Sequence, residues 1–428
     1  MKSSDVSPAL GPTIVAKQPS GSLYWLALGT FAVGTEGFMI AALLPTIAAD
    51  LSVKVATAGQ LVTIFALAYA VSSPILTAAL GGVDRRRLLI FSLAAFAVAN
   101  LVAASVHSFW TLAGARILLA LAAGLYVPGA NALASALVTP ERRGRALAIV
   151  NGGITIAIAL GVPIGALVGE RLGWRMTFVG VAALSALATV ALKLRLPVHI
   201  GAGLHTATLR ERLVVVRQPV VAHALATTTL WAIGAYTVYT YLAPFLRSAT
   251  VVSAPQISLV LLVWGISAAV GVALGGSFSD RHGPAAVQIP ALVVLAFAFS
   301  TLSISAHFLS PAMATLPVCI AVVLWGISAW SFYPPQQARL ISAIGLKAAP
   351  IALSLNASFM YLGFSLGAAI GSVTLALSGT ANLGYVGALF ELGSLLLIRV
   401  LTSLKLPGEL IPPAGQVHAR PAESLPPR

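Results

Sequence analysis

About twelve apolar segments, each roughly 20 residues or longer, follow one another along the chain and are separated by short polar gaps. An α-helix rises about 1.5 Å per residue, so each segment is long enough to cross roughly 30 Å of hydrocarbon. Hydrophobic residues make up 58% of the sequence and charged residues only 8%. Soluble domains contain about a quarter charged residues, so the sequence predicts an all-α integral membrane protein.

The segments fall into two groups of six, separated by a basic linker. The first six are expected over residues 23–44, 57–80, 88–106, 109–135, 146–169 and 174–192, and the second six over residues 219–245, 256–278, 286–307, 313–338, 350–377 and 383–401. The expected divisions are a cytoplasmic tail (1–22), a six-helix half (23–192), a cytoplasmic linker (193–218), a second six-helix half (219–401) and a disordered cytoplasmic tail (402–428). The linker is too short for a domain, and we expect one or two amphipathic turns in it.

Basic residues are concentrated in alternate gaps, which predicts the orientation of the chain. With a cytoplasmic N-terminus, the cytoplasmic gaps hold Arg85, Arg86, Arg87, Arg142, Arg143, Arg145, Lys193, Arg195, Arg210, Arg212, Arg217, Arg281, Arg339 and Lys347, and the opposite gaps hold only Lys54, Arg171, Arg175 and Arg247. The positive-inside rule then places both termini in the cytoplasm and the protein in the cell (inner) membrane. Loops that face anionic lipid explain the net charge of +14, so no nucleic acid partner is expected.

The sequence contains few residues or motifs of the kinds that bind cofactors or metals or that carry out catalysis. Cys319 is the only cysteine, which excludes disulfides and cysteine-based metal sites, and we expect neither a metal nor a cofactor. No phosphate-binding Gly-x-x-x-x-Gly-Lys-Ser/Thr loop is present, so an ATP-driven pump would need a separate subunit, and energy for any pump would otherwise have to come from an ion gradient. Ser267 and Ser328 each follow Gly-Ile, but no histidine lies mid-membrane to act as their base, so we expect no enzyme.

Glycines recur every four residues in the fifth segment and again in the eleventh, its counterpart in the second half. The two stripes are Gly161, Gly165 and Gly169, and Gly363, Gly367 and Gly371. Small residues at this spacing lie on one helix face and let two backbones approach closely in lipid. Two interpretations stay open: the stripes pack helices rigidly, or they let the two halves rock past each other.

A loop in the second half carries a motif. Residues 275–283 read GGSFSDRHG and include Asp280, Arg281 and Gly283. This stretch resembles the Gly-x-x-x-Asp-Arg-x-Gly loop of the major facilitator superfamily. Residues 80–87 are a degenerate copy in the first half, with no acid at the motif's usual position, so the charge relay of that loop is not expected there.

Within that superfamily, the first half resembles the twelve-span drug:proton antiporters, including sugar-efflux and chloramphenicol-efflux members. The matching motifs are residues 35–45 (TEGFMIAALLP), Arg116 with Gly124, residues 153–165 with Pro163, and residues 173–178 (GWRMTF). The second half matches mainly through its loop motif and its number of helices.

The resemblance implies two six-helix halves with alternating access at a site between them. It also implies efflux of a small organic molecule, such as a drug, sugar or nucleoside, in exchange for protons. The expected partners are this substrate, protons and the lipid bilayer, and a monomer is the expected functional unit. A proton-coupled importer is the main alternative, whereas a channel or a non-transporting sensor has no supporting sequence feature.

Three ionisable side chains fall well inside the apolar segments: Glu36, Arg116 and Glu391. An ionisable group at the centre of a membrane helix costs about 2.5–3.5 kcal/mol on insertion scales, so each one is a candidate functional group. Glu391 lies in the twelfth segment, which is peripheral to the cavity in the resembling family. We therefore expect a structural role for Glu391 or a contact with lipid headgroups.

Glu36 and Arg116 lie at matching depths. Glu36 precedes Pro45, at the outer end of its segment, by nine residues, or about 13 Å. Arg116 follows Ser108 by eight residues, or about 12 Å, on a helix of opposite direction. We expect Glu36 to carry the coupling proton and Arg116 to organise the site around it, and the alternative is a static ion pair.

Aromatic and amide side chains are candidates for a substrate cavity. The aromatic candidates are Tyr69, Tyr236, Tyr239, Trp264, Trp330 and Tyr361, although Trp and Tyr also collect at membrane interfaces. The amides Gln336, Gln337 and Asn356 lie near the cytoplasmic ends of late segments and could line an inward mouth. Hydrogen bonding between helices is the equal alternative for these amides.

Overall fold

The chain folds entirely into helices over the part that is described. The computed structural model describes residues 20–197 and 207–403, and the predicted tails over residues 1–19 and 404–428 lie outside this range. Within the described ranges there is no strand. Among the described residues, eleven helices are long and apolar enough to cross a membrane, and α8 (Leu209–Val216) with α9 (Pro219–Tyr239), which meet at 88°, form a twelfth candidate span. The prediction of an all-α, multi-pass membrane protein is confirmed.

The first half contains six spans, the fifth of which is interrupted. Its elements are α1 (Ser20–Asp50), α2 (Val55–Ala79), α3 (Arg85–Ser105), α4 (Phe109–Ala136), the 3-10 turn η1 (Pro140–Arg142), α5 (Arg143–Ile156), the π-helical turn η2 (Ala157–Gly161), α6 (Val162–Leu172) and α7 (Trp174–Arg195). Pro163 has no N–H, and its ring would clash with the carbonyl four residues earlier in a regular helix. The wider π turn just before Pro163 relieves that conflict.

The second half follows the linker helix α8. Beyond α9 its elements are α10 (Leu242–Ala249), α11 (Ala254–His282), α12 (Pro284–Phe308), α13 (Pro311–Ser331), α14 (Tyr333–Ser378), the 3-10 turn η3 (Thr380–Asn382) and α15 (Leu383–Ser403). The tenth span, predicted to end at residue 338, continues to Gly345. Gly345 has φ 75°, a backbone conformation that favours glycine, and it divides α14 into the end of the tenth span and the eleventh span.

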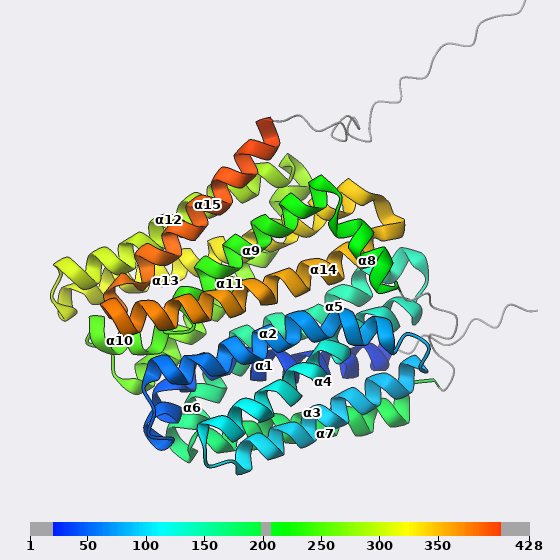
Figure 1. Ribbon diagram of the computed structural model, residues 1–428, viewed down its shortest axis with the longest axis horizontal. Helices are drawn as coiled ribbons and strands as arrows, with labels where there is room; N and C mark the ends of the chain where they lie inside the picture. The colour runs from blue at the N-terminus through cyan, green and yellow to red at the C-terminus, as the bar shows by residue number, and fades with distance from the viewer. Residues whose placement is uncertain (1–19, 198–206, 404–428) are drawn as a thin grey trace, which may run out of the picture.

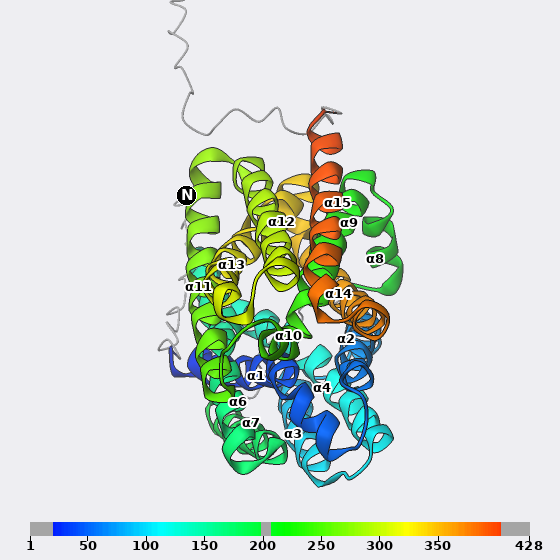
Figure 2. The ribbon, with the colours of Figure 1, turned by 90° about the vertical axis from the view of Figure 1, so that its left-hand side faces the viewer.

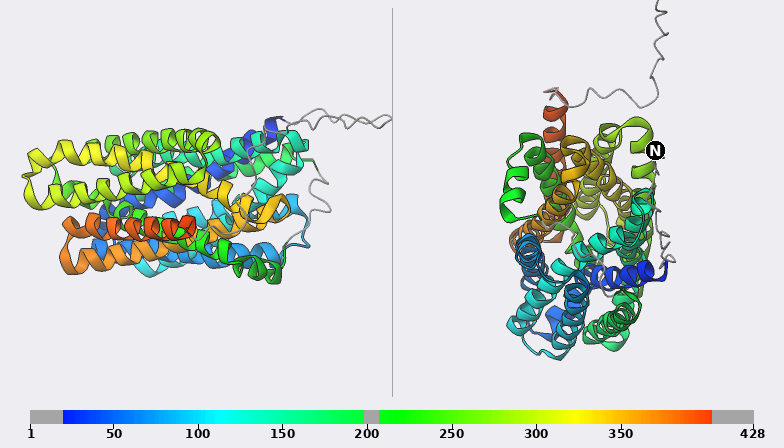
Figure 3. Two further views of the ribbon diagram at one scale, coloured as in Figure 1. Left: turned by 90° about the horizontal axis from the view of Figure 1, so that it is seen from above. Right: turned by 90° about the vertical axis from the view of Figure 1, so that its right-hand side faces the viewer.

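The two halves lie side by side (Figure 1). In this view α1 to α7 lie mainly in the lower part, and α9 and α12 to α15, in green to red, lie in the upper part. Figure 2 and Figure 3 show the same division from other sides. α2 and α14 meet across the boundary, where Ser365 Oγ donates to the carbonyl of Thr63 (3.0 Å) and Ser372 Oγ to the carbonyl of Ala56 (2.9 Å).

The linker helix joins the two halves at one end of the bundle, which we call the linker end. A capping box between Thr208 and Glu211 starts α8. The side chain of Arg212 is buried, and its guanidinium donates to Thr77 Oγ1 of α2 (3.1 Å) and to Ser354 Oγ of α14 (2.9 Å). One linker arginine therefore contacts both halves. The short amphipathic element expected in the linker is thus a helix with a defined packing surface.

The glycine stripes pack helices within each half. The first stripe faces α1, with Gly161 opposite Thr35, Gly165 opposite Met39 and Gly169 opposite Leu43. The second stripe lies on α14 and faces α9, with Gly363 opposite Ala232, Gly367 opposite Ile233 and Gly371 opposite the carbonyl of Thr237. The interpretation in which the stripes form the sliding surface between the halves is therefore wrong. Each stripe instead brings two backbones of one half close together.

The loop motif of the second half forms a tight connection between α11 and α12. Gly283 has φ 85° and lies between the last residue of α11 and Pro284, the first residue of α12. A positive φ at this position favours glycine, and proline is well tolerated at the start of the next helix. Asp280 and Arg281 are exposed at the end of α11. In the degenerate copy of the first half, Asp84 instead caps α3 by accepting a hydrogen bond from the backbone N–H of Arg87 (2.8 Å).

Candidate functional site

The structure brings Glu36 and Arg116 together in the interior of the first half. Both side chains are completely buried, and Nη1 of Arg116 forms an ion pair with Oε1 of Glu36. Arg116 Nε donates to the carbonyl of Leu61 (3.3 Å), and its guanidinium lies 4.2 Å from the ring centre of Phe65. The pair therefore links α1 and α4 to α2. Matching depths on two antiparallel helices made this contact possible, and the structure shows that it forms.

The ion pair is incompletely hydrogen-bonded. Oε2 of Glu36 and Nη2 of Arg116 are buried and have no hydrogen-bond partner among the described residues. The hydroxyl of the neighbouring Thr35 is also buried without a partner there. Buried polar atoms are normally paired, so the pair and the neighbouring hydroxyl leave hydrogen-bonding capacity unused.

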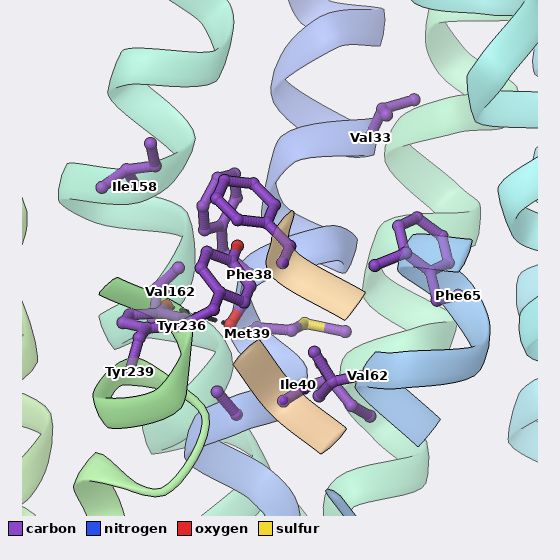
Figure 4. Close-up of a cluster of buried hydrophobic side chains, with 14 of the residues drawn as sticks. Val33, Phe38, Met39, Ile40, Val62, Phe65, Ile158, Val162, Tyr236 and Tyr239 are labelled. Atoms are coloured by element: carbon purple, nitrogen blue, oxygen red, sulfur yellow. Dashed lines mark hydrogen bonds between the residues drawn. The ribbon is translucent and has the colours of Figure 1, made fainter. Parts of the chain in front are cut away.

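Phe38 connects this pair to the second half. It lies two residues after Glu36 on α1, and its ring centre lies 6.2 Å from that of Tyr236 and 6.1 Å from that of Tyr239. Tyr239 Oη donates to the backbone carbonyl of Phe38 (3.0 Å). Figure 4 shows Phe38 facing Tyr236 and Tyr239 of α9, with Phe65 of α2 on the other side of α1. Phe38 therefore connects the helix that carries Glu36 to the aromatic residues of the second half.

A small aromatic pocket with a volume of about 10 Å³ lies next to Phe38. Its lining residues are Phe38, Trp231, Ala235, Tyr236, Tyr239, Trp264, Trp325, Ala329, Trp330 and Phe364. Four of the predicted cavity residues, Tyr236, Tyr239, Trp264 and Trp330, are among them. This volume has room for about one water molecule, so the pocket is closed to a small organic molecule in this conformation.

The two remaining predicted aromatics lie beside the pocket. The rings of Tyr69 (α2) and Tyr361 (α14) stack across the boundary between the halves, with centres 3.8 Å apart. Tyr361 also contacts Phe364, which lines the pocket, with ring centres 5.3 Å apart. This stack closes the space between α2 and α14 at that level.

Sequence reasoning missed several pocket residues, above all Trp231, Trp325 and Phe364. A signal for Trp231 was present, because it precedes Ala235 by four residues and Tyr239 by eight, which places all three on one face of α9. Phe38 could have been found from its position next to Glu36. Trp325 and Phe364 carry no comparable local signal.

The predicted amides form contacts between helices. Gln336 is completely buried; its Nε2 donates to the carbonyl of Ala224 (2.6 Å) and to Thr228 Oγ1 (2.9 Å), and its Oε1 accepts from Gln288 Nε2 (2.7 Å). Thr228 Oγ1 in turn donates to Oδ1 of the buried Asn356 (2.7 Å). Of the two interpretations for Gln336 and Asn356, the structure thus shows hydrogen bonding between helices. Gln337 is half-buried.

Glu391 is completely buried between α15 and α9, so the expected contact with lipid headgroups is wrong for this conformation. A Cβ at Gly234 would lie 2.5 Å from Oε1 of Glu391, so the absence of a side chain at 234 makes room for the carboxyl. Both carboxyl oxygens have no hydrogen-bond partner within the described ranges. Among the residues that the structure describes, no group of three or more His, Cys, Asp or Glu could hold a metal ion.

Solved structures share this fold. One is a bacterial homolog to the human lysosomal transporter Spinster, in an inward-facing and unoccupied conformation, with a TM-score of 0.69, 18% identity and coverage of 91% of this chain and 96% of that chain. Another is a mutant of the nucleoside transporter NupG, with a TM-score of 0.68, 15% identity and coverage of 90% and 100%. At these identities the likeness shows the fold alone.

Relatives of known sequence cover nearly the whole chain. The uncharacterized MFS-type transporter YbcL of Bacillus subtilis (strain 168) is 33% identical over 368 residues, which cover 86% of this chain and 92% of that protein. The inner membrane transport protein YdhP of Escherichia coli (strain K12) is 32% identical and covers 89% of this chain and 96% of its own. A chloramphenicol resistance protein of Streptomyces lividans is 32% identical, with coverage of 89% and 95%.

The family assignment follows from the sequence model of the Major Facilitator Superfamily, which matches residues 26–368. The match includes the fifth-span glycines, the loop motif around Asp280 and the whole Glu36–Arg116 site. It agrees with the helix count, with the relatives and with the shared fold. The chain is therefore a membrane transporter rather than an enzyme, and it belongs to the Major Facilitator Superfamily.

Proposed function

We propose that this transporter exports a small organic molecule in exchange for protons, with Glu36 as the proton carrier and Arg116 as the group that organises it. The observation that carries the proposal is the completely buried Glu36–Arg116 pair, which is incompletely hydrogen-bonded and in which Glu36 lies two residues before Phe38 of the aromatic pocket. Each unpaired buried polar atom destabilises a fold by about 1–3 kcal/mol. A pair that served packing alone would gain by having every atom paired.

Protonation of Glu36 is the step that couples the proton to the conformation. A neutral carboxyl holds a guanidinium less strongly than a carboxylate does, so Arg116 becomes available to another acceptor when Glu36 binds a proton. Phe38 transmits the change, because it lies on the same helix as Glu36 and accepts the hydrogen bond of Tyr239 from the second half. Coupling requires that proton and substrate bind with different affinities in the inward and outward states.

The fifth span is the proposed place of movement in the first half. The π turn η2 contacts both α1 and α11: a Cβ at Gly34 would lie 3.0 Å from the Cβ of Ala157, and one at Gly265 would lie 2.5 Å from the carbonyl of Ile158. Such turns are frequent at functional sites in helices. We assign Gly161, Pro163 and Gly165 to this conformational element.

The equivalent element of the second half is the glycine stripe of α14. Gly363, Gly367 and Gly371 keep α14 in contact with α9, which carries Tyr236 and Tyr239 of the pocket. A movement of α14 would therefore also move α9 and, with it, Tyr236 and Tyr239. The tight turn at Asp280, Arg281 and Gly283 would keep the ends of α11 and α12 together during the movement.

Export is favoured over import by two observations. The fifth-span segment resembles that of antiporters, and a relative that is 32% identical is named a chloramphenicol resistance protein. The basic residues in alternate gaps support a cytoplasmic location for the linker end. The second candidate function is proton-coupled import, which would use the same buried pair.

Everted membrane vesicles distinguish the two directions. A panel of antibiotics, sugars and nucleosides is added outside vesicles that have an acidic lumen, and the luminal pH is followed with a fluorescent dye. Antiport predicts that a transported compound enters while protons leave, so that the lumen becomes more alkaline. Acidification of the lumen by a compound added outside would instead show that substrate and proton move together, as in an importer.

A further inference from the structure

Glu391 of α15 is a buried carboxyl that the proposed function does not use. Its side chain is completely buried, and neither carboxyl oxygen has a hydrogen-bond partner within the described part of the chain. Of the acids that the structure describes, only Glu36 is buried as completely, and Glu36 is paired with Arg116. Glu391 is therefore a completely buried acid whose carboxyl oxygens no base compensates.

The carboxyl lies inside a close contact between helices. α15 packs between α9 and α12 (Figure 2). A Cβ at Gly234 of α9 would lie 2.5 Å from Oε1 of the carboxyl and 2.8 Å from the carbonyl oxygen of Gly387 of α15. Three residues after the carboxyl, Ser394 Oγ donates to the carbonyl of Thr227 of α9 (3.2 Å). On the other side, a Cβ at Gly387 would lie 3.0 Å from the ring of Phe299 of α12.

The bases on these helices lie far from the carboxyl. They are His223 of α9, His307 of α12 and Arg399 of α15. His223 precedes Gly234 by eleven residues and Arg399 follows the carboxyl by eight, which correspond to about 16 Å and 12 Å along the helices. His307 lies near the start of α15, where its ring centre is 5.7 Å from that of Tyr385. The eleventh span, which also touches α15, contains no charged residue.

The tyrosines of the neighbouring helices make their contacts elsewhere. Tyr236 stacks on Phe364, Tyr239 donates to the carbonyl of Phe38, Tyr361 stacks on Tyr69, and Tyr385 contacts His307. A tyrosine is neutral near pH 7, so it would not compensate a carboxylate. No titratable side chain of the described neighbours thus supplies a positive charge to this site.

The protonation state of Glu391 follows from these surroundings. An ionised carboxyl that is removed from water and has no partner is far more costly than a neutral polar group. The neutral carboxyl also gains a donor, and the carbonyl oxygen of Gly387, which borders the same space, is an acceptor that this donor could use. A carboxylate has no donor to offer to that oxygen.

We propose that Glu391 is a proton-binding site of the second half, and that its bound proton allows α15 to pack against α9 and α12. Loss of the proton would leave a charge that needs water, so α15 would have to separate from α9. A proton suits this single carboxyl better than a metal ion, which requires several oxygen ligands. The site is independent of the proposed export, because it does not involve Glu36 and would serve equally in an importer.

Infrared spectroscopy of the purified full-length protein tests the proposal directly. Exposed carboxyls are ionised at about pH 7.5, so a C=O stretching band of protonated carboxyl at that pH reports buried, neutral acids. Dodecyl maltoside is the detergent, because it has no ester carbonyl that would overlap the band. The variants are Glu391→Gln and Glu391→Met, and the second keeps the test open if the first does not fold. The controls are Glu36→Gln, which removes the other buried acid, and Glu170→Gln, since Glu170 is exposed on α6.

The expected result is a protonated-carboxyl band in the parent that is lost in the Glu391 variants and kept in both controls. A parent without the band, or a band that persists in a Glu391 variant, would overturn the proposal. Because Glu36→Gln keeps the expected band, this outcome does not depend on whether Glu36 carries the coupling proton.

The pH dependence of unfolding in SDS is the second measurement. The native state keeps a proton that the unfolded chain releases above the ordinary range of glutamate, so stability falls as pH rises. Relative to Glu391→Gln, the equilibrium constant for unfolding of the parent should rise by up to about tenfold per pH unit between about pH 6 and pH 8. The same pH dependence in parent and variant would show that no proton is held at Glu391.

Discussion

Replacing Arg116 by Met is expected to lower the free energy of unfolding by about 3–5 kcal/mol, because it leaves the carboxylate of Glu36 buried without its partner. Nothing else in the immediate surroundings compensates that charge: Oε2 of Glu36 has no hydrogen-bond partner among the described residues, and Oε1 is bound to Arg116. Titration of the protein with SDS in mixed micelles, followed by intrinsic fluorescence, gives the free energy. Arg210→Met is the control, because Arg210 is exposed on α8 and its replacement should change stability by less than about 0.5 kcal/mol.

The double variant Glu36→Met with Arg116→Met separates stability from function. Replacing a buried ion pair by two apolar side chains is often neutral or stabilising, so we expect the double variant to recover most of the stability that Arg116→Met loses. It should nevertheless exchange no protons. A double variant that still exchanges protons for substrate would show that the pair holds helices together and does nothing more.

Replacing Gly367 by Leu is expected to destabilise the second half by about 3 kcal/mol or more, at or above the upper end of overpacking effects. A Cβ at 367 would lie 2.5 Å from the carbonyl oxygen of Ile233 and 3.0 Å from the amide nitrogen of Thr237. Both atoms belong to the backbone of α9, so rotation of a side chain cannot relieve the clash. α9 and α14 would have to separate, and Thr237 Oγ1 would lose its contact with the carbonyl of Gly367 (3.2 Å).

Gly276→Leu is the matched control for this prediction. Gly276 also lies in a helix, α11, but a Cβ there would meet no atom within 4 Å. Leu is favoured over Gly in a helix by roughly 1 kcal/mol, so this variant should be as stable as the parent or slightly more stable. Equal effects of the two substitutions would mean that the close contact between α9 and α14 contributes little.

The spans were predictable from sequence because a run of about 20 apolar residues has few alternatives to a membrane helix. The shared depth of Glu36 and Arg116 was predictable as well, since depth along a helix follows from residue counts, but their contact required knowing that α1 and α4 are neighbours. The glycine stripes were visible, but their partners were not, and the interpretation of a surface between the halves was wrong. Spacing shows which residues share a helix face without showing which helix that face meets.

The remaining errors have a common physical cause. In a soluble helix the polar face marks the solvent side, whereas a membrane helix is apolar toward both lipid and protein, so its buried face carries no amphipathic signal. This explains why the burial of Glu391 and the positions of Trp325 and Phe364 escaped sequence reasoning. The hydrogen bonds of Gln336 could not be predicted, because the sequence does not show that Thr228 of α9 lies next to it.

The most direct measurement for the central claim compares proton-coupled transport with substrate exchange in Glu36→Gln. Proteoliposomes are loaded with the compound that the vesicle assay identifies, and exchange with labelled compound outside is measured without a proton gradient, followed by accumulation driven by a gradient. If Glu36 carries the proton, Glu36→Gln keeps exchange but loses gradient-driven accumulation and the accompanying proton movement. Accumulation by Glu36→Gln equal to that of the parent would contradict the account and place the coupling group elsewhere in the chain.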